Sequence, residues 1–232
     1  MSAPDTSRAP IAVALDTADL AVATRWASAV SPHVSTLKIG LELFCHEGPA
    51  AVEKVRAAVD LDIFLDLKLH DIPATVAGAA RAVAHLQPRY LTVHAGGGPA
   101  MVSAAVTALP DTLVAGVTIL TSLAAEELDR LGIIGPPRDA ACRLARLAVD
   151  AGARALVCSP QEVAPIRATV GPDIVLIVPG VRPAGSGHQD QARVGTPEQA
   201  LADGADLLVI GRPITGAADP AAAAADIAAS LR

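Results

Sequence analysis

Short apolar runs alternate with alanine-rich stretches along the whole chain, and this alternation constrains the fold more than any other feature. The runs that read as strands are 11–16, 35–40, 62–69, 90–95, 113–120, 155–159, 174–180 and 207–212. Helical stretches lie between them, for example 73–86, 99–109, 139–151 and 219–231. Continuous apolar strands that alternate with helices form a parallel sheet covered by helices. Eight such units within 232 residues predict a single (β/α)8 barrel, a TIM barrel.

A doubly wound sheet is the alternative fold, but the chain has no glycine-rich fingerprint of the dinucleotide-binding type. No linker divides the sequence, so we expect one domain over 1–232 with a short flexible N-terminus at 1–9. The longest irregular segment is 181–195, which is rich in glycine and polar residues. Loops of this length in a compact domain are usually functional or disordered, so the segment is a candidate part of a site.

The composition excludes several classes of function. The net charge of −6 and the absence of a basic patch argue against binding to nucleic acid or to an anionic membrane. Three widely spaced cysteines without a CxxC pair predict reduced thiols in a cytoplasmic protein rather than a disulfide framework or a zinc site. The polar stretch 1–10 has no signal-like apolar core, and no apolar run reaches roughly 18 residues, so no membrane span is expected.

The third predicted strand carries charges where an apolar strand should continue. Asp66 and Lys68 interrupt the run 62–69, and Asp71 follows at its end. Residues two apart in a strand share a face, so Asp66 and Lys68 should point the same way, roughly 7 Å apart. Burying charges costs several kcal/mol each unless they are paired. We infer that this segment carries a function.

Further residues, most of them polar, fall at the ends of the predicted strands, where (β/α)8 barrels build their active sites. They are Asp16, Lys38, His94, Thr121, Ser122, Pro179, Arg182, Gly211 and Arg212. Phosphate sites in this fold are often formed by the loops after strands seven and eight. Arg182 and Arg212 fall in those two loops. The pattern therefore predicts a phosphate ester as substrate.

Each of these residues also has a structural interpretation. Asp71 suits a helix N-cap, and Lys38 with Asp66 suits a structural ion pair. His94 is interpreted here as a core histidine, and His70 is given no role. Each structural interpretation is acceptable by itself, but together they do not explain the pattern. Random placement would not collect so many charged residues at strand ends.

These residues match a known family. The string DLKLHDIP at 66–73 resembles the DxKxxD signature of orotidine 5′-monophosphate decarboxylases in their bacterial form. That signature alone is moderately specific, whereas an ordered set of blocks over nearly the whole chain is highly specific. The further blocks that resemble the family, in its order, are ALD at 14–16, LKIG at 37–40, ILTS at 119–122, VCSPQE at 157–162, VPGVRP at 178–183, DQARV at 190–194 and VIGRP at 209–213.

The resemblance implies a homodimeric (β/α)8 barrel that converts orotidine 5′-monophosphate to UMP and CO2, the last step of de novo pyrimidine nucleotide synthesis. It implies no metal and no organic cofactor. Lys68 would protonate C6 of the pyrimidine, and Asp66 would lie against the substrate carboxylate and hold Lys68. Lys38 would complete the charged array with Asp71, which would come from the other subunit.

The resemblance also implies which residues bind the rest of the substrate. Asp16 and Lys38 would contact the ribose, and Thr75 would reach the ribose side from the other subunit. Thr121 and Ser122 are expected near the pyrimidine, and Pro179 is expected to contact the substrate. The residues expected at the phosphate are Arg182, Gln191, Gly211 and Arg212.

Two other functions are compatible with parts of the pattern. A sugar-phosphate decarboxylase of the same superfamily, such as 3-keto-gulonate 6-phosphate decarboxylase, shares DxKxxD but uses Mg²⁺ with an acidic residue at the end of strand two. This chain has Lys38 there, which argues against a metal. The other is a non-catalytic phosphate-binding barrel that senses nucleotides, and the intact set of Asp66, Lys68 and Asp71 argues against it.

Overall fold

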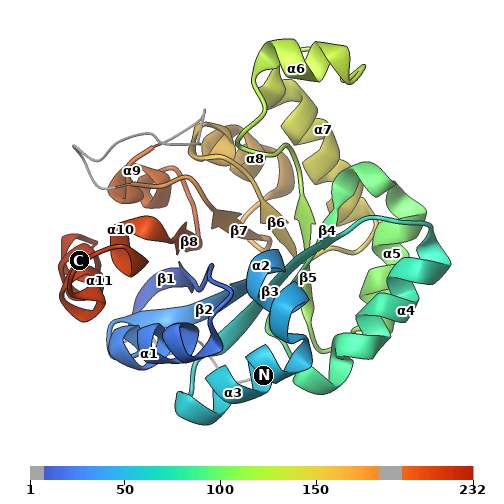
Figure 1. The fold of residues 1–232 in the computed structure, drawn as a ribbon. Helices are drawn as coiled ribbons and strands as arrows, with labels where there is room; N and C mark the ends of the chain where they lie inside the picture. Colours follow the sequence, from blue (N-terminus) through green and yellow to red (C-terminus); the bar gives the residue numbers. More distant parts are fainter. Residues whose placement is uncertain (1–7, 183–194, 232) are drawn as a thin grey trace.

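The computed structural model describes residues 8–182 and 195–231. Eight parallel strands close into a barrel in sequence order, and helices surround it (Figure 1). The predicted (β/α)8 barrel is therefore confirmed. The strands are β1 (Ala9–Ala14), β2 (Val34–Gly40), β3 (Asp62–Leu69), β4 (Tyr90–His94), β5 (Leu113–Val117), β6 (Ala155–Val157), β7 (Val175–Val178) and β8 (Leu207–Ile210).

The helices lie outside the barrel, and several begin with proline. Proline suits the first helical turn because it lacks the backbone N–H, which would have no partner within the helix there. Asp19 and Asp219 cap α1 and α11 by accepting hydrogen bonds from two backbone N–H groups each. The α-helices are α1 (Leu20–Val30), α2 (Leu41–Glu47), α3 (Pro49–Ala58), α4 (Pro73–Val83), α5 (Pro99–Ala108), α6 (Ala125–Arg130), α7 (Pro137–Asp150), α8 (Val163–Val170), α9 (Pro197–Ala202), α10 (Arg212–Thr215) and α11 (Pro220–Ser230). Short 3-10 turns are η1 (Ala84–Leu86), η2 (Ala95–Gly97) and η3 (Pro160–Glu162).

The N-terminal boundary differs from the expectation. The flexible N-terminus predicted at 1–9 falls mainly on residues 1–7, which lie outside the described residues. Ala9 already belongs to β1, where its N–H donates to the carbonyl of His33 over 3.1 Å. In the described part of the chain, no helix combines the length and the apolar character that crossing a membrane requires.

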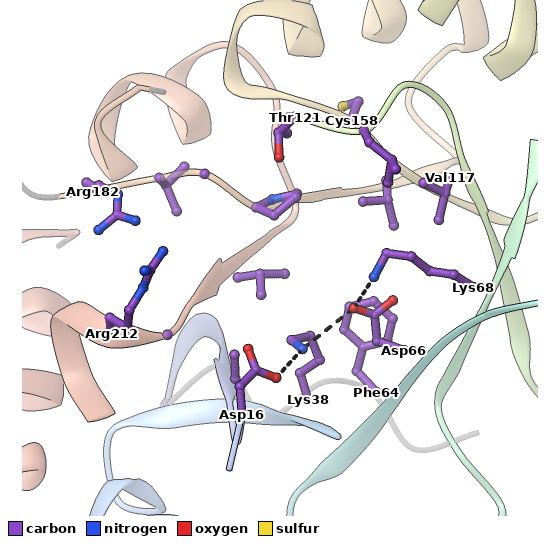
Figure 2. Close-up of a pocket in the computed structure, with 18 of the residues that line it drawn as sticks. Asp16, Lys38, Phe64, Asp66, Lys68, Val117, Thr121, Cys158, Arg182 and Arg212 are labelled. Atoms are coloured by element: carbon purple, nitrogen blue, oxygen red, sulfur yellow. Dashed lines mark hydrogen bonds and ion pairs between the residues drawn. The ribbon is translucent and has the colours of Figure 1, made fainter. Parts of the chain in front are cut away.

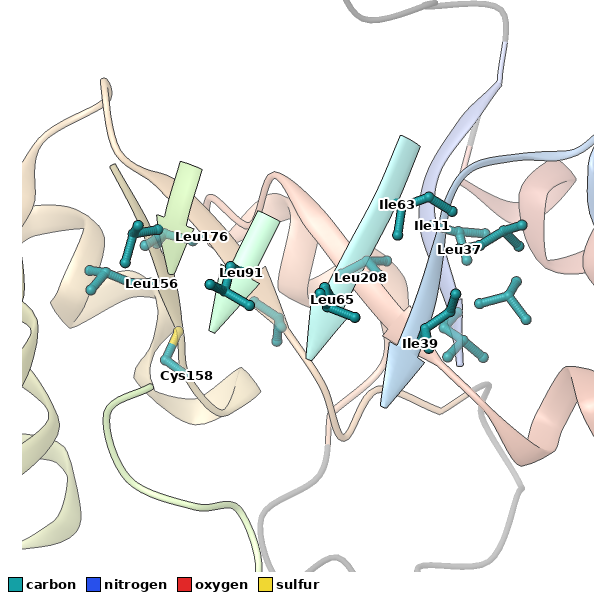
Figure 3. Packing of buried hydrophobic residues seen from close by; sticks show 14 of the residues in the cluster. Ile11, Leu37, Ile39, Ile63, Leu65, Leu91, Leu156, Cys158, Leu176 and Leu208 are labelled. Carbon is teal, nitrogen blue, oxygen red and sulfur yellow. The ribbon is translucent and has the colours of Figure 1, made fainter. Parts of the chain in front are cut away.

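Two apolar layers hold the barrel. The larger layer lies between the strands and the helices, and Figure 3 shows its side chains on neighbouring strands, among them Ile39, Leu65 and Leu91. The smaller layer fills the barrel interior, where the rings of Phe64 and Tyr90 pack edge to face, 5.8 Å apart. Since Phe64 also lines the cavity described below, the packed interior supports the candidate site from beneath.

Candidate active site

A cavity of about 520 Å³ lies at the carboxyl ends of the strands (Figure 2). Apolar residues missed by the sequence analysis complete its lining, among them Phe64, Val117 and Cys158. Nine of the predicted site residues line it together: Asp16, Lys38, Asp66, Lys68, Thr121, Pro179, Arg182, Gly211 and Arg212.

A row of alternating charges runs along one side of the cavity. The ammonium of Lys38 lies 2.9 Å from Asp16 Oδ1 and 3.6 Å from Asp66 Oδ2. The ammonium of Lys68 donates to the same Asp66 oxygen over 2.8 Å. Because Lys38 and Asp66 are only 7% and 8% exposed, these charges are held away from bulk water, where their mutual attraction is strong.

The end of β2 is built to leave room for this row. A Cβ atom at Gly40 would lie 2.7 Å from the Lys38 ammonium and 3.0 Å from Asp16 Oδ1. Any side chain at this position would therefore displace the Lys38 ammonium, so a glycine here leaves room for its contact with Asp16, which follows β1.

The backbone of β3 leaves regular strand geometry where it presents its charges. Leu65 pairs with Leu91 and Leu69 pairs with Val93, so four steps along β3 face only two along β4. Lys68 lies in this bulge with φ of 48°, a region that non-glycine residues rarely adopt. Such conformations cost of the order of 1–3 kcal/mol and gather at functional sites. The simple strand expectation for Asp66 and Lys68 was thus wrong in backbone detail, although the two side chains do meet.

The charge state of Asp66 follows from its neighbours. Burial alone would raise its pKa, but attraction by Lys38 and Lys68 and hydrogen bonds from Lys68 and Thr92 outweigh that effect. The pKa therefore lies below its usual value, and Asp66 is a carboxylate at neutral pH.

His94 ends β4 beside the charged row but is absent from the described lining of the cavity. Its ring centre lies 5.2 Å from that of His70. Burial, followed by the nearby His70 and Lys68, lowers the pKa of His94. His94 is therefore half-buried rather than a core histidine as expected, and its lowered pKa favours the neutral ring.

The arginines lie at the other side of the cavity. Figure 2 shows Arg182 and Arg212 facing one another, with Asp16 and Lys38 between them and the Asp66–Lys68 pair. Two guanidinium groups that converge in one cavity suit a phosphate, which accepts several hydrogen bonds from such forks.

Four predicted site residues are not placed in this cavity. Gln191 lies outside the described residues, and Ser122 is exposed on the loop after β5. Asp71 and Thr75 are exposed at the start of α4. Ile72 is the N-cap of α4, and within residues 8–182 and 195–231 the Asp71 carboxylate accepts a hydrogen bond from the Ile72 N–H alone, over 2.6 Å. The helix-cap interpretation of Asp71 was therefore wrong.

Metal ligands are not gathered in the described ranges 8–182 and 195–231, where no three His, Cys, Asp or Glu side chains are grouped to hold an ion. The charged row instead alternates carboxylates with ammonium groups. An anion bound beside Asp66 would be repelled by its carboxylate, which raises the energy of the bound state. The row can also deliver a proton from the Lys68 ammonium.

The chain is similar to one family of known proteins. Residues 9–227 match the model of the "Orotidine 5′-phosphate decarboxylase / HUMPS family". A protein of Thermobifida fusca named orotidine 5′-phosphate decarboxylase is 68% identical over 97% of this chain and 96% of its own length. One of Frankia casuarinae with the same name is 57% identical over 98% of this chain and 89% of its own.

Solved structures agree. The crystal structure of orotidine 5′-phosphate decarboxylase from Lactobacillus acidophilus has a TM-score of 0.83 and 33% sequence identity, and covers 97% of this chain and 99% of that chain. The match over nearly the full length, in sequence and in structure, means that the chain belongs to the orotidine 5′-phosphate decarboxylase / HUMPS family.

Proposed function

We propose that the chain is a carboxy-lyase that converts orotidine 5′-phosphate to UMP and CO2. The observation that carries this is the charged row of Asp16, Lys38, Asp66 and Lys68 in one cavity with Arg182 and Arg212. Such a cavity suits a substrate with a phosphate to be held at one end and a carboxylate to be lost at the other. The high identity to relatives of that name supports the same reaction.

Lys68 is the group that completes the reaction. When the bond between C6 and the carboxylate breaks, its electron pair stays on C6, and CO2 departs. The ring offers no good electron sink, so a fixed ammonium aimed at C6 stabilises the developing charge. Lys68 then gives a proton to C6, which yields UMP, and the lysine regains a proton from solvent.

Asp66 and Lys38 prepare the site for that step. Asp66 lies where its negative charge opposes the substrate carboxylate, so the bound substrate is raised in energy relative to the transition state. Its lowered pKa supports a charged form for this role. Lys38 lies 3.6 Å from Asp66 and 2.9 Å from Asp16, and so links the reacting end to the ribose end.

The remaining residues orient the substrate. Arg182, Gly211 and Arg212 hold the phosphate, together with Gln191 from the segment outside the described residues. Thr121, Pro179 and Ser122 serve the pyrimidine side. Binding energy from the remote phosphate is available to hold the ring against the charged row, which raises the rate of the chemical step.

We further propose that the active protein is a homodimer in which Asp71 and Thr75 complete the partner's site. Both are exposed in a single chain, and so is their neighbour Ile72, a large apolar side chain that is 66% exposed. The family resemblance, which implies that Asp71 and Thr75 reach the site of the other subunit, supports the same arrangement. A cytoplasmic location stays a prediction from the three free cysteines.

The first test is a spectrophotometric assay of the purified protein. We expect consumption of orotidine 5′-phosphate, formation of UMP, and a rate that extensive EDTA treatment leaves unchanged, because the Lys38 ammonium at the end of β2 would repel Mg²⁺. Activity on 3-keto-gulonate 6-phosphate alone, or a rate lost to EDTA and restored by Mg²⁺, would move the chain to the metal-dependent alternative.

The phosphate assignment predicts a substrate-dependent effect of Arg212. Arg212→Ala removes a charge-assisted hydrogen bond worth about 1.5–3 kcal/mol, so kcat/KM should fall roughly tenfold to 150-fold. The loss should shrink sharply for the nucleoside that lacks the phosphate. Arg138→Ala, an exposed arginine on α7, is the matched control and should have no effect. An equal loss of kcat/KM on the nucleoside would show that Arg212 does not act by binding the phosphate.

A further inference from the structure

The hydroxyl of Thr92 on β4 joins the two central groups of the charged row. It accepts a hydrogen bond from the backbone N–H of Lys68 over 2.8 Å. It donates to Asp66 Oδ1 over 2.9 Å. A hydroxyl has one donor and two acceptor positions, so both bonds are formed together. Thr92 is fully buried, and it is not among the described residues that line the cavity, so it acts on its neighbours rather than on the substrate.

One of these bonds replaces a bond of the sheet. Between Leu65 and Leu69, β3 bulges away from its register with β4. The backbone N–H of Lys68 lies within that bulge and donates to the Thr92 side chain. Lys68 has φ of 48°, and such a conformation persists only where the surrounding structure fixes it. The Thr92 hydroxyl is a contact that fixes it here.

The other bond sets the orientation of the Asp66 carboxylate. With Oδ1 bound to Thr92, Oδ2 is directed at the Lys68 ammonium at 2.8 Å and the Lys38 ammonium at 3.6 Å. Rotation of the carboxylate would lose the Thr92 bond as well as these contacts. A single hydroxyl therefore fixes Lys68 at two points. It binds the Lys68 backbone N–H directly, and it holds the Lys68 ammonium through Asp66.

We propose that Thr92 is a positioning residue for decarboxylation, which aims the Lys68 ammonium at the reacting carbon. The inference rests on the proposed roles of Lys68 and Asp66. Small errors in the placement of a reacting group cost large factors in rate. Loss of the hydroxyl should therefore act on the chemical step more than on nucleotide binding, which is carried by the arginines on the other side of the cavity.

The test is Thr92→Val, which removes the hydroxyl and keeps a β-branched side chain in the strand. We expect kcat to fall about 10- to 100-fold, while KM and the Kd of UMP change by less than about threefold. Thr92→Ser keeps the hydroxyl and should restore kcat to within about fivefold of the parent. Thr92→Ala also lacks the hydroxyl and decides the question if the valine variant does not fold.

Two controls distinguish a failure of the role proposed for Thr92 from a failure of the proposed function. Thr36→Val makes the same change at a buried position on β2, where the hydroxyl lies 3.2 Å from Ser35 Oγ, and should leave kcat unchanged. Lys68→Ala in the same assay tests the proposed function itself. An unchanged kcat in Thr92→Val beside an inactive Lys68→Ala would overturn only the role of Thr92. Equal losses in the serine and valine variants, or a parallel rise in the Kd of UMP, would overturn it too.

Discussion

Lys68→Ala should lower kcat by about 10⁴-fold or more, the largest effect expected of any single substitution in this protein. The proton that Lys68 delivers is worth about 10²–10⁴-fold, and the cation that stabilises the carbanion is worth a further 10²–10³-fold or so. Both contributions come from one ammonium, which lies 2.8 Å from Asp66 in the cavity. The measurement is single-turnover decarboxylation beside the parent enzyme.

The fold should survive this change. Removing one partner of a buried ion pair is costly when the other charge is left alone. Asp66 would keep Lys38 at 3.6 Å and the Thr92 hydroxyl at 2.9 Å, so it is not left alone. The Tm and the Kd of UMP should therefore stay near those of the parent, and Lys54→Ala, an exposed lysine on α3, is the matched control. A kcat within about tenfold of the parent would mean that another group protonates C6.

The fold could be predicted from the sequence because each apolar run is buried on both faces in the barrel. The ends of the strands could not be placed as well. The run at 113–120 forms a strand only to Val117, after which Ile119 and Leu120 leave the sheet and line the cavity. An apolar side chain does not require a backbone hydrogen bond of the sheet, so the apolar run continues past the end of the strand.

The convergence of Asp16, Lys38, Asp66 and Lys68 could also be predicted, because parallel strands of a closed barrel bring their carboxyl ends together. The link through Thr92 could not. A threonine in a strand is an ordinary residue by its β propensity. Its two hydrogen bonds arise from a register shift between β3 and β4, which depends on how two separate strands pair.

The residues of α4 show a different limit. A single sequence cannot distinguish an Asp that caps its own helix from one that serves a neighbouring subunit. The structure removes the first interpretation, since Ile72 is the N-cap. The exposure of Asp71 and Thr75 leaves the second interpretation to be tested by mixing subunits.

Mixing Lys68→Ala protein with Asp71→Ala protein should restore activity. Each homodimer should be nearly inactive, because every site in it lacks one of the two groups. A hybrid dimer instead has one site with both defects and one site with neither. Random exchange makes about half of the dimers hybrid, and half of the sites in a hybrid are intact, so about a quarter of the parent activity should return.

The decisive control is a second mixture, of Lys68→Ala protein with Asp66→Ala protein. Asp66 and Lys68 hydrogen-bond within one chain, so every hybrid site still lacks one of them and no activity should return. Exchange is followed independently with two tags of different mass, so that a failure to mix is recognised. If the first mixture stays inactive although hybrids are present, Asp71 acts within its own chain, and the shared site must be abandoned. If both mixtures recover, the paired charges on β3 themselves cross between subunits, which their 2.8 Å contact in a single chain opposes.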